Sequence, residues 1–106
     1  MPIAEGKPMI KGSKRVTILG KRWTLRLVPK HGRRGHYGLC DHPESADKTI
    51  TVEANHEDER VLDTVLHELL HAGAWNLDEQ VVTQWATDVA RILTTLGWKR
   101  HPDAPS

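Results

Sequence analysis

The feature that most constrains this chain is a helical pattern over residues 61–74 that contains two histidines four positions apart. Apolar side chains recur there at spacings of three and four residues: Val61, Leu62, Val65, Leu66, Leu69 and Leu70. This period is typical of an amphipathic helix that packs against another layer. On such a helix, His67 and His71 project from one face, one turn apart, and can share one metal ion.

Glu68 directly follows the first histidine and completes the pattern His-Glu-x-x-His. A glutamate at this position is the usual general base for a water molecule activated by a metal. A pattern this short also occurs by chance, but chance leaves two histidines and a glutamate inside a leucine-rich helix unexplained. We therefore predict that His67 and His71 bind zinc and that Glu68 is the catalytic base.

A catalytic zinc site needs a third protein ligand and one open position. The next helix is expected to start at Asp78 after a short linker, so Asp78 and Glu79 are the candidates. Asp78 is also suited to cap that helix, which is worth about 1 kcal/mol. Glu79 is therefore the preferred third ligand, and Asp78 is the alternative. The alternative explanation of Glu79 is an ordinary surface acid, which the helix dipole favours at a helix start.

The rest of the chain predicts an α+β fold. Residues 16–19 and 23–28 indicate a hairpin with a turn at Gly20-Lys21, and Trp23, Leu25 and Leu27 share one face of it. Residues 37–41 and 48–52 fit a third and a fourth strand, the latter with Ile50 and Val52 toward the core. We predict a small antiparallel sheet of three or four strands packed on two C-terminal helices, the first capped by Asn55 and carrying the His-Glu-x-x-His pattern. The second helix is expected to bury one large set of side chains: Val81, Val82, Trp85, Val89, Ile92, Leu93 and Leu96.

The length of 106 residues fits one domain. We expect a flexible arm over residues 1–13, the metal-binding domain over residues 14–98 and a frayed tail over residues 99–106. The lone Cys40 cannot form an internal disulfide, and neither a signal peptide nor a membrane-spanning run is present in the sequence. These features predict a cytoplasmic protein that is not in a membrane.

Charge is distributed unevenly along the chain. Residues 1–40 contain ten Lys/Arg and one acidic residue, whereas residues 41–106 contain five Lys/Arg and thirteen acidic residues. The basic half could bind nucleic acid or an acidic protein, or the two halves could form oppositely charged layers that attract each other on folding. We favour the layers, and also favour a solvated connection over a phosphate contact for the basic loop at residues 30–36.

Other side chains with donor atoms have simpler explanations. Cys40 ends a predicted strand, where a cysteine is more often a small core residue than a ligand. Four histidines outside the motif fall in loops or at a helix start, where they are usually solvated: His31, His36, His42 and His56. Asp63 could orient an imidazole and Tyr37 could stabilise an oxyanion, but a solvated acid and a packing residue are the preferred interpretations.

The run Val65-Leu66-His67-Glu68-Leu69-Leu70-His71-Ala72, followed by Leu77-Asp78-Glu79, resembles the small zincin-like metallopeptidases found in phage and prophage genomes. These are in turn similar to SprT-like minimal zincin domains. The resemblance is tightest over residues 61–98 and extends weakly to residues 38–41 and 48–52. It implies zinc held by His67, His71 and a later residue such as Glu79, with Glu68 activating water.

We therefore expect a zinc metallopeptidase that hydrolyses peptide bonds of a peptide or protein substrate, with strand 48–52 offering an edge to an extended peptide. The alternative is a zinc-stabilised binding protein with little or no peptidase activity, which contacts nucleic acid or an acidic protein through its basic half. A protease that acts on proteins bound to nucleic acid would combine both features.

Overall fold

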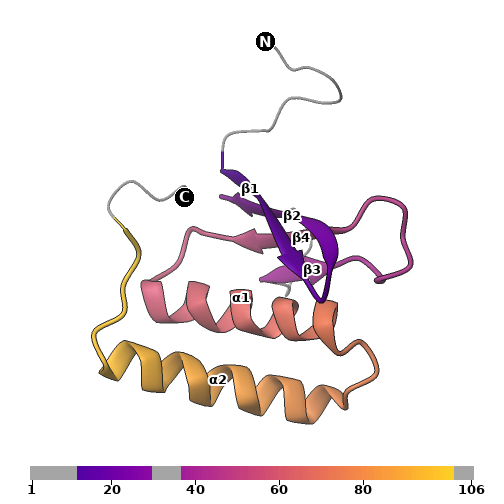
Figure 1. The fold of residues 1–106 in the computed structure, drawn as a ribbon. Coiled ribbons are helices and arrows are strands. Elements are labelled where there is room, and N and C mark those ends of the chain that lie inside the picture. Colours follow the sequence, from indigo (N-terminus) through magenta and orange to yellow (C-terminus); the bar gives the residue numbers. More distant parts are fainter. Residues whose placement is uncertain (1–11, 30–36, 102–106) are drawn as a thin grey trace.

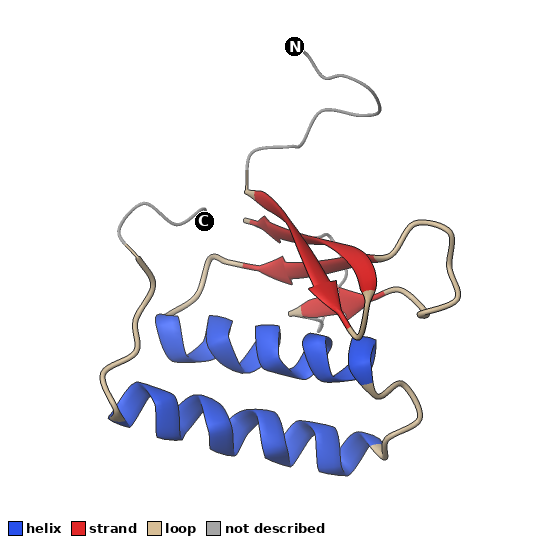
Figure 2. Ribbon diagram, viewed as in Figure 1, coloured by secondary structure: helices blue, strands red, loops and turns tan. Residues whose placement is uncertain are grey.

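A computed structural model describes residues 12–29 and 37–101 and gives the predicted α+β class. The strands are β1 (Ser13–Ile18), β2 (Lys21–Val28), β3 (Gly38–Cys40) and β4 (Thr49–Glu53), and the helices are α1 (Asp58–Gly73) and α2 (Glu79–Thr95). The four strands form one sheet, one face of which is covered by α1 (Figure 1). Helix α2 lies on the side of α1 that faces away from the sheet, so the fold has three layers (Figure 2).

The sheet is mixed, whereas the sequence predicted an antiparallel one. Its strand order is β1-β2-β4-β3, and β4 is parallel to β2 and antiparallel to β3. Strand β4 is therefore internal, and the prediction that residues 48–52 form an edge was wrong. The alternation that identified this strand gives its buried face, on which Ile50 and Val52 are fully buried, but it carries no information on the neighbouring strands. Strand β3, which pairs with β4, is the edge strand on that side of the sheet.

The hairpin turn between β1 and β2 lies one residue earlier than predicted. Ile18 pairs with Lys21, so the two turn residues are Leu19 and Gly20. Both have positive φ, 49° and 80°, which is typical of the turn type that matches the twist of a two-residue hairpin. Leu19, which the sequence placed in the strand, is consequently 80% exposed.

The core lies between the sheet and α1. Its buried members come from β2, β4 and α1: Trp23, Ile50, Val52, Val61 and Ala72. Leu25, Leu27, Val65 and Leu69 pack against this group. The predicted inward face of the hairpin and the apolar stripe of the first helix are therefore confirmed.

Helix α2 buries small side chains instead of the large ones expected from the sequence. Its buried residues are Val82, which the sequence predicted, and Ala86 and Ala90, which it did not. The larger apolar residues Val81, Trp85, Ile92 and Leu96 are 44–77% exposed. Periodicity shows that one side of a helix is apolar, but α2 has two adjacent apolar stripes, one of large residues and one that contains Ala86 and Ala90. The stripe with the alanines allows the two helices to approach more closely, so it is the one that is buried.

The boundaries of the helical part also differ from the prediction. Helix α1 begins at Asp58 with Glu57 at the N-cap position, so Asn55 is not the cap. Arg100 is not frayed, because its guanidinium donates to the Asp58 carboxylate at 2.8 Å and to the carbonyls of Ala54 and His56 at 3.1 and 3.2 Å. Residues 1–11 of the predicted arm, residues 102–106 of the tail and the basic loop at residues 30–36 lie outside the described residues.

Neither α1 nor α2 is long and apolar enough to span a bilayer, and the described part of the chain has no other helix.

Candidate metal centre

The two histidines of the motif lie on the face of α1 that meets the start of α2. His67 and His71 are one turn apart on this helix. The linker after α1 is tight, since the backbone N–H of Ala74 donates to the carbonyl of Leu70 at 2.7 Å and that of Leu77 donates to the carbonyl of Ala74 at 3.0 Å. The chain therefore turns back at once, and the first residue of α2, Glu79, reaches the histidines.

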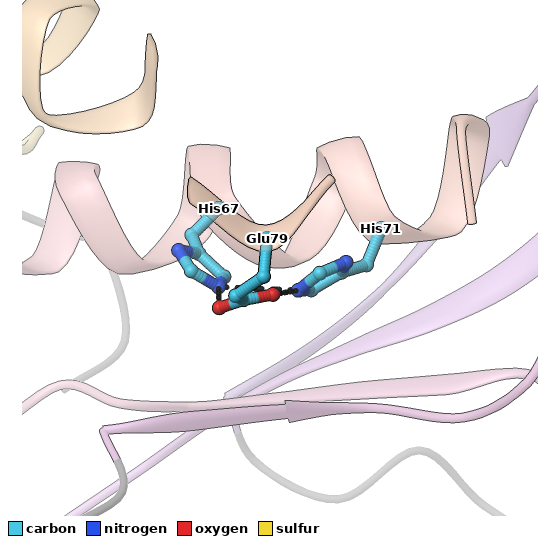
Figure 3. A group of neighbouring side chains, drawn as sticks. All are labelled: His67, His71 and Glu79. Carbon is cyan, nitrogen blue, oxygen red and sulfur yellow. Dashed lines mark hydrogen bonds and ion pairs between the residues drawn. The ribbon is translucent and has the colours of Figure 1, made fainter. Parts of the chain in front are cut away.

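Three side chains converge at this point (Figure 3). The Nε2 atoms of His67 and His71 are 3.1 Å apart. The Glu79 carboxylate lies against both rings, with Oε2 at 3.1 Å from Nε2 of His67 and Oε1 at 3.0 Å from Nε2 of His71. Thr83, one turn further along α2, donates its hydroxyl to Oε2 of Glu79 at 3.5 Å. The carboxylate is thus fixed toward the imidazoles.

The spacing of these atoms fits a small divalent cation. Zinc–nitrogen and zinc–oxygen bonds of 2.0–2.2 Å at tetrahedral angles imply donor separations of roughly 3.3 Å. The two Nε2 atoms are 3.1 Å apart, and each lies 3.0–3.1 Å from a different oxygen of the Glu79 carboxylate, within a few tenths of an ångström of this value. Two imidazoles and one carboxylate also leave a fourth position free in a tetrahedral arrangement. Within the described residues, this is the one group of three such side chains that could hold a metal ion.

The protonation of His71 suits metal binding. Burial lowers the pKa of His71, and the neighbouring His67 lowers it further, whereas the negative charge of Glu79 opposes both effects. A lowered pKa keeps the imidazole neutral at pH 7, which is the form that binds a metal ion. The two rings are about one-fifth exposed, whereas the Glu79 side chain is 65% exposed. The site is therefore buried on the α1 side and open on the α2 side.

Glu68 lies beside the three side chains without belonging to them. It is 8% exposed, and burial together with the charge of Glu79 raises the pKa of its carboxyl to about 7. It lines a pocket of about 250 Å³ whose walls also include His67 and, on β3, Gly38. A carboxyl whose pKa is near neutrality is suited to accept and return a proton.

Gly38 places the edge strand against this carboxyl. A Cβ atom at this position would lie 2.7 Å from Cγ2 of Thr64 and 3.0–3.1 Å from the Glu68 side chain. Only glycine allows a strand to approach the helix so closely. Sequence analysis assigned Gly38 to a strand but missed this role, for which the glycine at the strand start was the available signal.

The structure thus brings together the side chains proposed from the sequence. Glu79, preferred over Asp78, is the carboxylate that meets the histidines, and Asp78 is the N-cap residue of α2. The reason given for that preference was wrong, because Asp78 makes no side-chain capping hydrogen bond. What selects Glu79 is the tight linker, which directs the first helical residue toward α1.

The other candidate donors lie elsewhere or have other partners. Cys40 packs against the core, as predicted, and burial raises the pKa of its thiol to about 12. His42 contacts the ring of Trp75, and His56 pairs with Glu53 at 3.1 Å. Asp63 accepts a hydrogen bond from the Thr87 hydroxyl at 3.0 Å, so it links the two helices. His31 and His36 fall outside the described residues.

Comparisons of the chain with models of known protein families, with curated proteins and with solved structures find no match.

Proposed function

We propose that this protein is a zinc-dependent metallopeptidase, in which His67, His71 and Glu79 hold the metal and Glu68 is the general base. The observation that supports this proposal is the convergence of His67, His71 and Glu79, whose ligand atoms lie within 4.8 Å of one another, next to a buried glutamate in a pocket. The likeness of the His-Glu-x-x-His helix and its following Glu79 to small zincin-like metallopeptidases points in the same direction.

Zinc bound by three protein ligands lowers the pKa of a water molecule at its open position and polarises a carbonyl oxygen. The protein supplies the proton transfer. Glu68 accepts one proton from the attacking water while the water oxygen bonds to the peptide carbonyl carbon. The carbon–nitrogen bond then breaks, and Glu68 returns the proton to the leaving amine. A pKa of about 7 for Glu68 before metal binding matches this double role, and a bound cation would lower it toward the base form.

The substrate backbone is expected to lie along β3, the sheet edge next to Glu68. This strand pairs with β4 on one side, and its first residue lines the pocket that contains Glu68. An exposed strand edge offers backbone donors and acceptors to an extended peptide. The proposal thus assigns to β3 the part that the sequence interpretation gave to residues 48–52.

The deciding experiment compares the zinc-loaded wild type with Glu68→Gln on a mixed peptide library, with products identified by mass spectrometry. Glutamine keeps the size of the side chain and removes its ability to take a proton. We expect the variant to bind zinc stoichiometrically and to lose hydrolysis by at least about 100-fold, within the range of general base catalysis. Glu44→Gln is the matched control, because Glu44 is an exposed glutamate that does not line the pocket, and it should retain full activity.

Two results would contradict the proposal. If wild type and Glu68→Gln are both inactive while each holds one zinc per chain, the protein is a zinc-stabilised binding protein. If both cleave peptides equally, Glu68 is not the base. In the first case, binding to DNA that weakens steeply with added salt would identify nucleic acid as the partner of the basic half.

A further inference from the structure

The pocket next to Glu68 extends away from the metal centre along α1. Residues at positions 60, 63, 64, 67 and 68 of this helix line it from one side, and Thr83 and Thr87 of α2 line it from the other. Tyr37 and Gly38 close it at the start of β3. The pocket therefore begins at His67 and Glu68, where a peptide bond would be cut, and ends at Arg60.

Arg60 is a positioned cation at the far end of this pocket. Its guanidinium carbon lies 5.0 Å from the centre of the Tyr37 ring, and this contact holds it at the pocket wall. Within the described residues, no carboxylate lies within ion-pair distance of Arg60, whereas Arg91 has Asp88 at 3.3 Å and Arg100 has Asp58 at 2.8 Å. Arg60 is thus exposed, lies over the Tyr37 ring and forms part of the pocket wall.

The distance from Arg60 to the metal centre corresponds to a short piece of substrate. Arg60 precedes His67 by seven residues, which is about 10 Å along an α-helix. An extended peptide advances about 3.3 Å per residue, so two to three residues span this distance. The guanidinium fork fits a carboxylate, with which it can form two parallel hydrogen bonds.

Acidic residues also line the pocket. Asp63 is the other charged wall residue on this stretch of α1, and one of its oxygens already accepts the Thr87 hydroxyl at 3.0 Å. Glu68 lies at the opposite end of the pocket wall, next to His67.

We propose that Arg60 determines specificity by binding a carboxylate of the peptide substrate two to three residues from the bond that is cut. The carboxylate belongs either to an acidic side chain or to the C-terminus, and both present the same chemistry to the guanidinium. This inference rests on the proposed peptidase function for the position of the cut, but it is tested by binding as well as by hydrolysis.

The test measures peptide binding to zinc-loaded Glu68→Gln protein, which should bind substrates without cleaving them. A set of hexapeptides carries glutamate or glutamine at each position in turn, and each peptide is made with a free or an amidated C-terminus. Calorimetry should show about tenfold tighter binding when a carboxylate occupies the matching place, the effect expected of one charge-assisted contact. The glutamate series and the C-terminal series distinguish the two sources of the carboxylate.

Arg60→Gln, added to the same protein, should abolish this preference, and Arg60→Lys should retain part of it. Arg22→Gln is the matched control, because Arg22 is an exposed arginine on β2 outside the pocket. In the wild-type background, Arg60→Gln should lower kcat/KM for carboxylate-bearing peptides by about tenfold.

Equal affinity for acidic and neutral peptides, a preference for basic peptides governed by Asp63, or an acidic preference that survives Arg60→Gln would each overturn the inference. Failure of the proposed function gives a different result. A protein that never hydrolyses peptides, but binds carboxylate-bearing ones through Arg60, would reject the peptidase and support the binding site.

Discussion

Helices α1 and α2 lie side by side with almost equal lengths, 16 and 17 residues, but they contribute to the candidate site in different ways. Helix α1 is covered by the sheet on one side and by α2 on the other. It holds the two histidines and the buried glutamate. Helix α2 is covered on one side only by the described residues, and it contributes a single exposed carboxylate at its first residue. The covered helix therefore provides the precise part of the site, and the outer helix closes it.

This difference has a physical basis. A side chain on α1 is held by packing from two layers, so its rotamer is fixed before any metal arrives. Glu79 is 65% exposed, and its position depends on the tight turn after α1 and on the packing of small residues between the helices. Removing a ligand from α1 should consequently lower the metal affinity more than removing the ligand from α2.

The largest expected effect is on metal affinity. His71→Ala should weaken zinc binding by more than about 100-fold, because even residues that only support a ligand change affinity by 10–100-fold. Glu79→Ala should weaken it by about 10–100-fold, since water can replace an exposed carboxylate. Competition with a chromogenic chelator measures both affinities. The comparison of the helices fails if Glu79→Ala has the larger effect.

Asp78→Ala is the matched control for Glu79→Ala. It removes an adjacent carboxylate that does not meet the histidines and makes no capping hydrogen bond, so zinc affinity should change by less than about threefold. An effect of Asp78→Ala that exceeds that of Glu79→Ala would reassign the third ligand to Asp78.

The second effect concerns the buried carboxyl of α1 and the stability of the metal-free protein. The pKa of Glu68 rises from 4.5 to about 7 on folding. Between these values the folded state binds more protons than the unfolded state, so the free energy of unfolding should fall as pH rises from 4.5 to 7 and level off above. The loss should be about 3 kcal/mol, at 1.36 kcal/mol per pKa unit.

Urea unfolding of wild type and Glu68→Gln between pH 4.5 and 8 isolates this contribution. The lowered pKa of His71 acts in the opposite direction, because it makes stability rise with pH, but it is present in both proteins and is removed in their difference. A difference between the two proteins that does not vary with pH would show that Glu68 keeps an ordinary pKa.

The same contrast between covered and outer parts explains how far the sequence could predict the structure. Where periodicity and burial coincide, as for Trp23 in the hairpin and Val61 in the first helix, the sequence predicted the element and its buried face. The proximity of His67 and His71 followed from helix geometry alone. Glu79 could be proposed, but its selection over Asp78 depended on a turn whose geometry the sequence does not specify.

Features that depend on distant parts of the chain were not predictable in this way. The parallel pairing of β2 with β4 is a choice of neighbours, and the alternating residues of β4 fit either an edge or an internal strand. Gly38 was visible in the sequence, but its contact with Glu68 is created by the approach of β3 to α1. Which stripe of α2 faces inward was decided by the spacing between two helices, since both stripes are apolar.

The smallest expected effects are changes in the free energy of unfolding, which should differ between the buried and the exposed side of α2. Ala86 is fully buried against α1, so Ala86→Leu overfills the interface and should lower the free energy of unfolding by about 2 kcal/mol. Ile92 is 56% exposed, and Ile92→Ala should change stability by about 0.5 kcal/mol or less. Urea unfolding at one pH measures both. A different result would be that Ile92→Ala lowers the free energy of unfolding more than Ala86→Leu does, and that this loss grows with protein concentration. Because only association makes stability depend on concentration, the exposed apolar residues of α2 would then be buried against a second copy in solution. In that case α2 is covered on both sides, as α1 is, and the contrast between the two helices no longer accounts for the exposed position of Glu79.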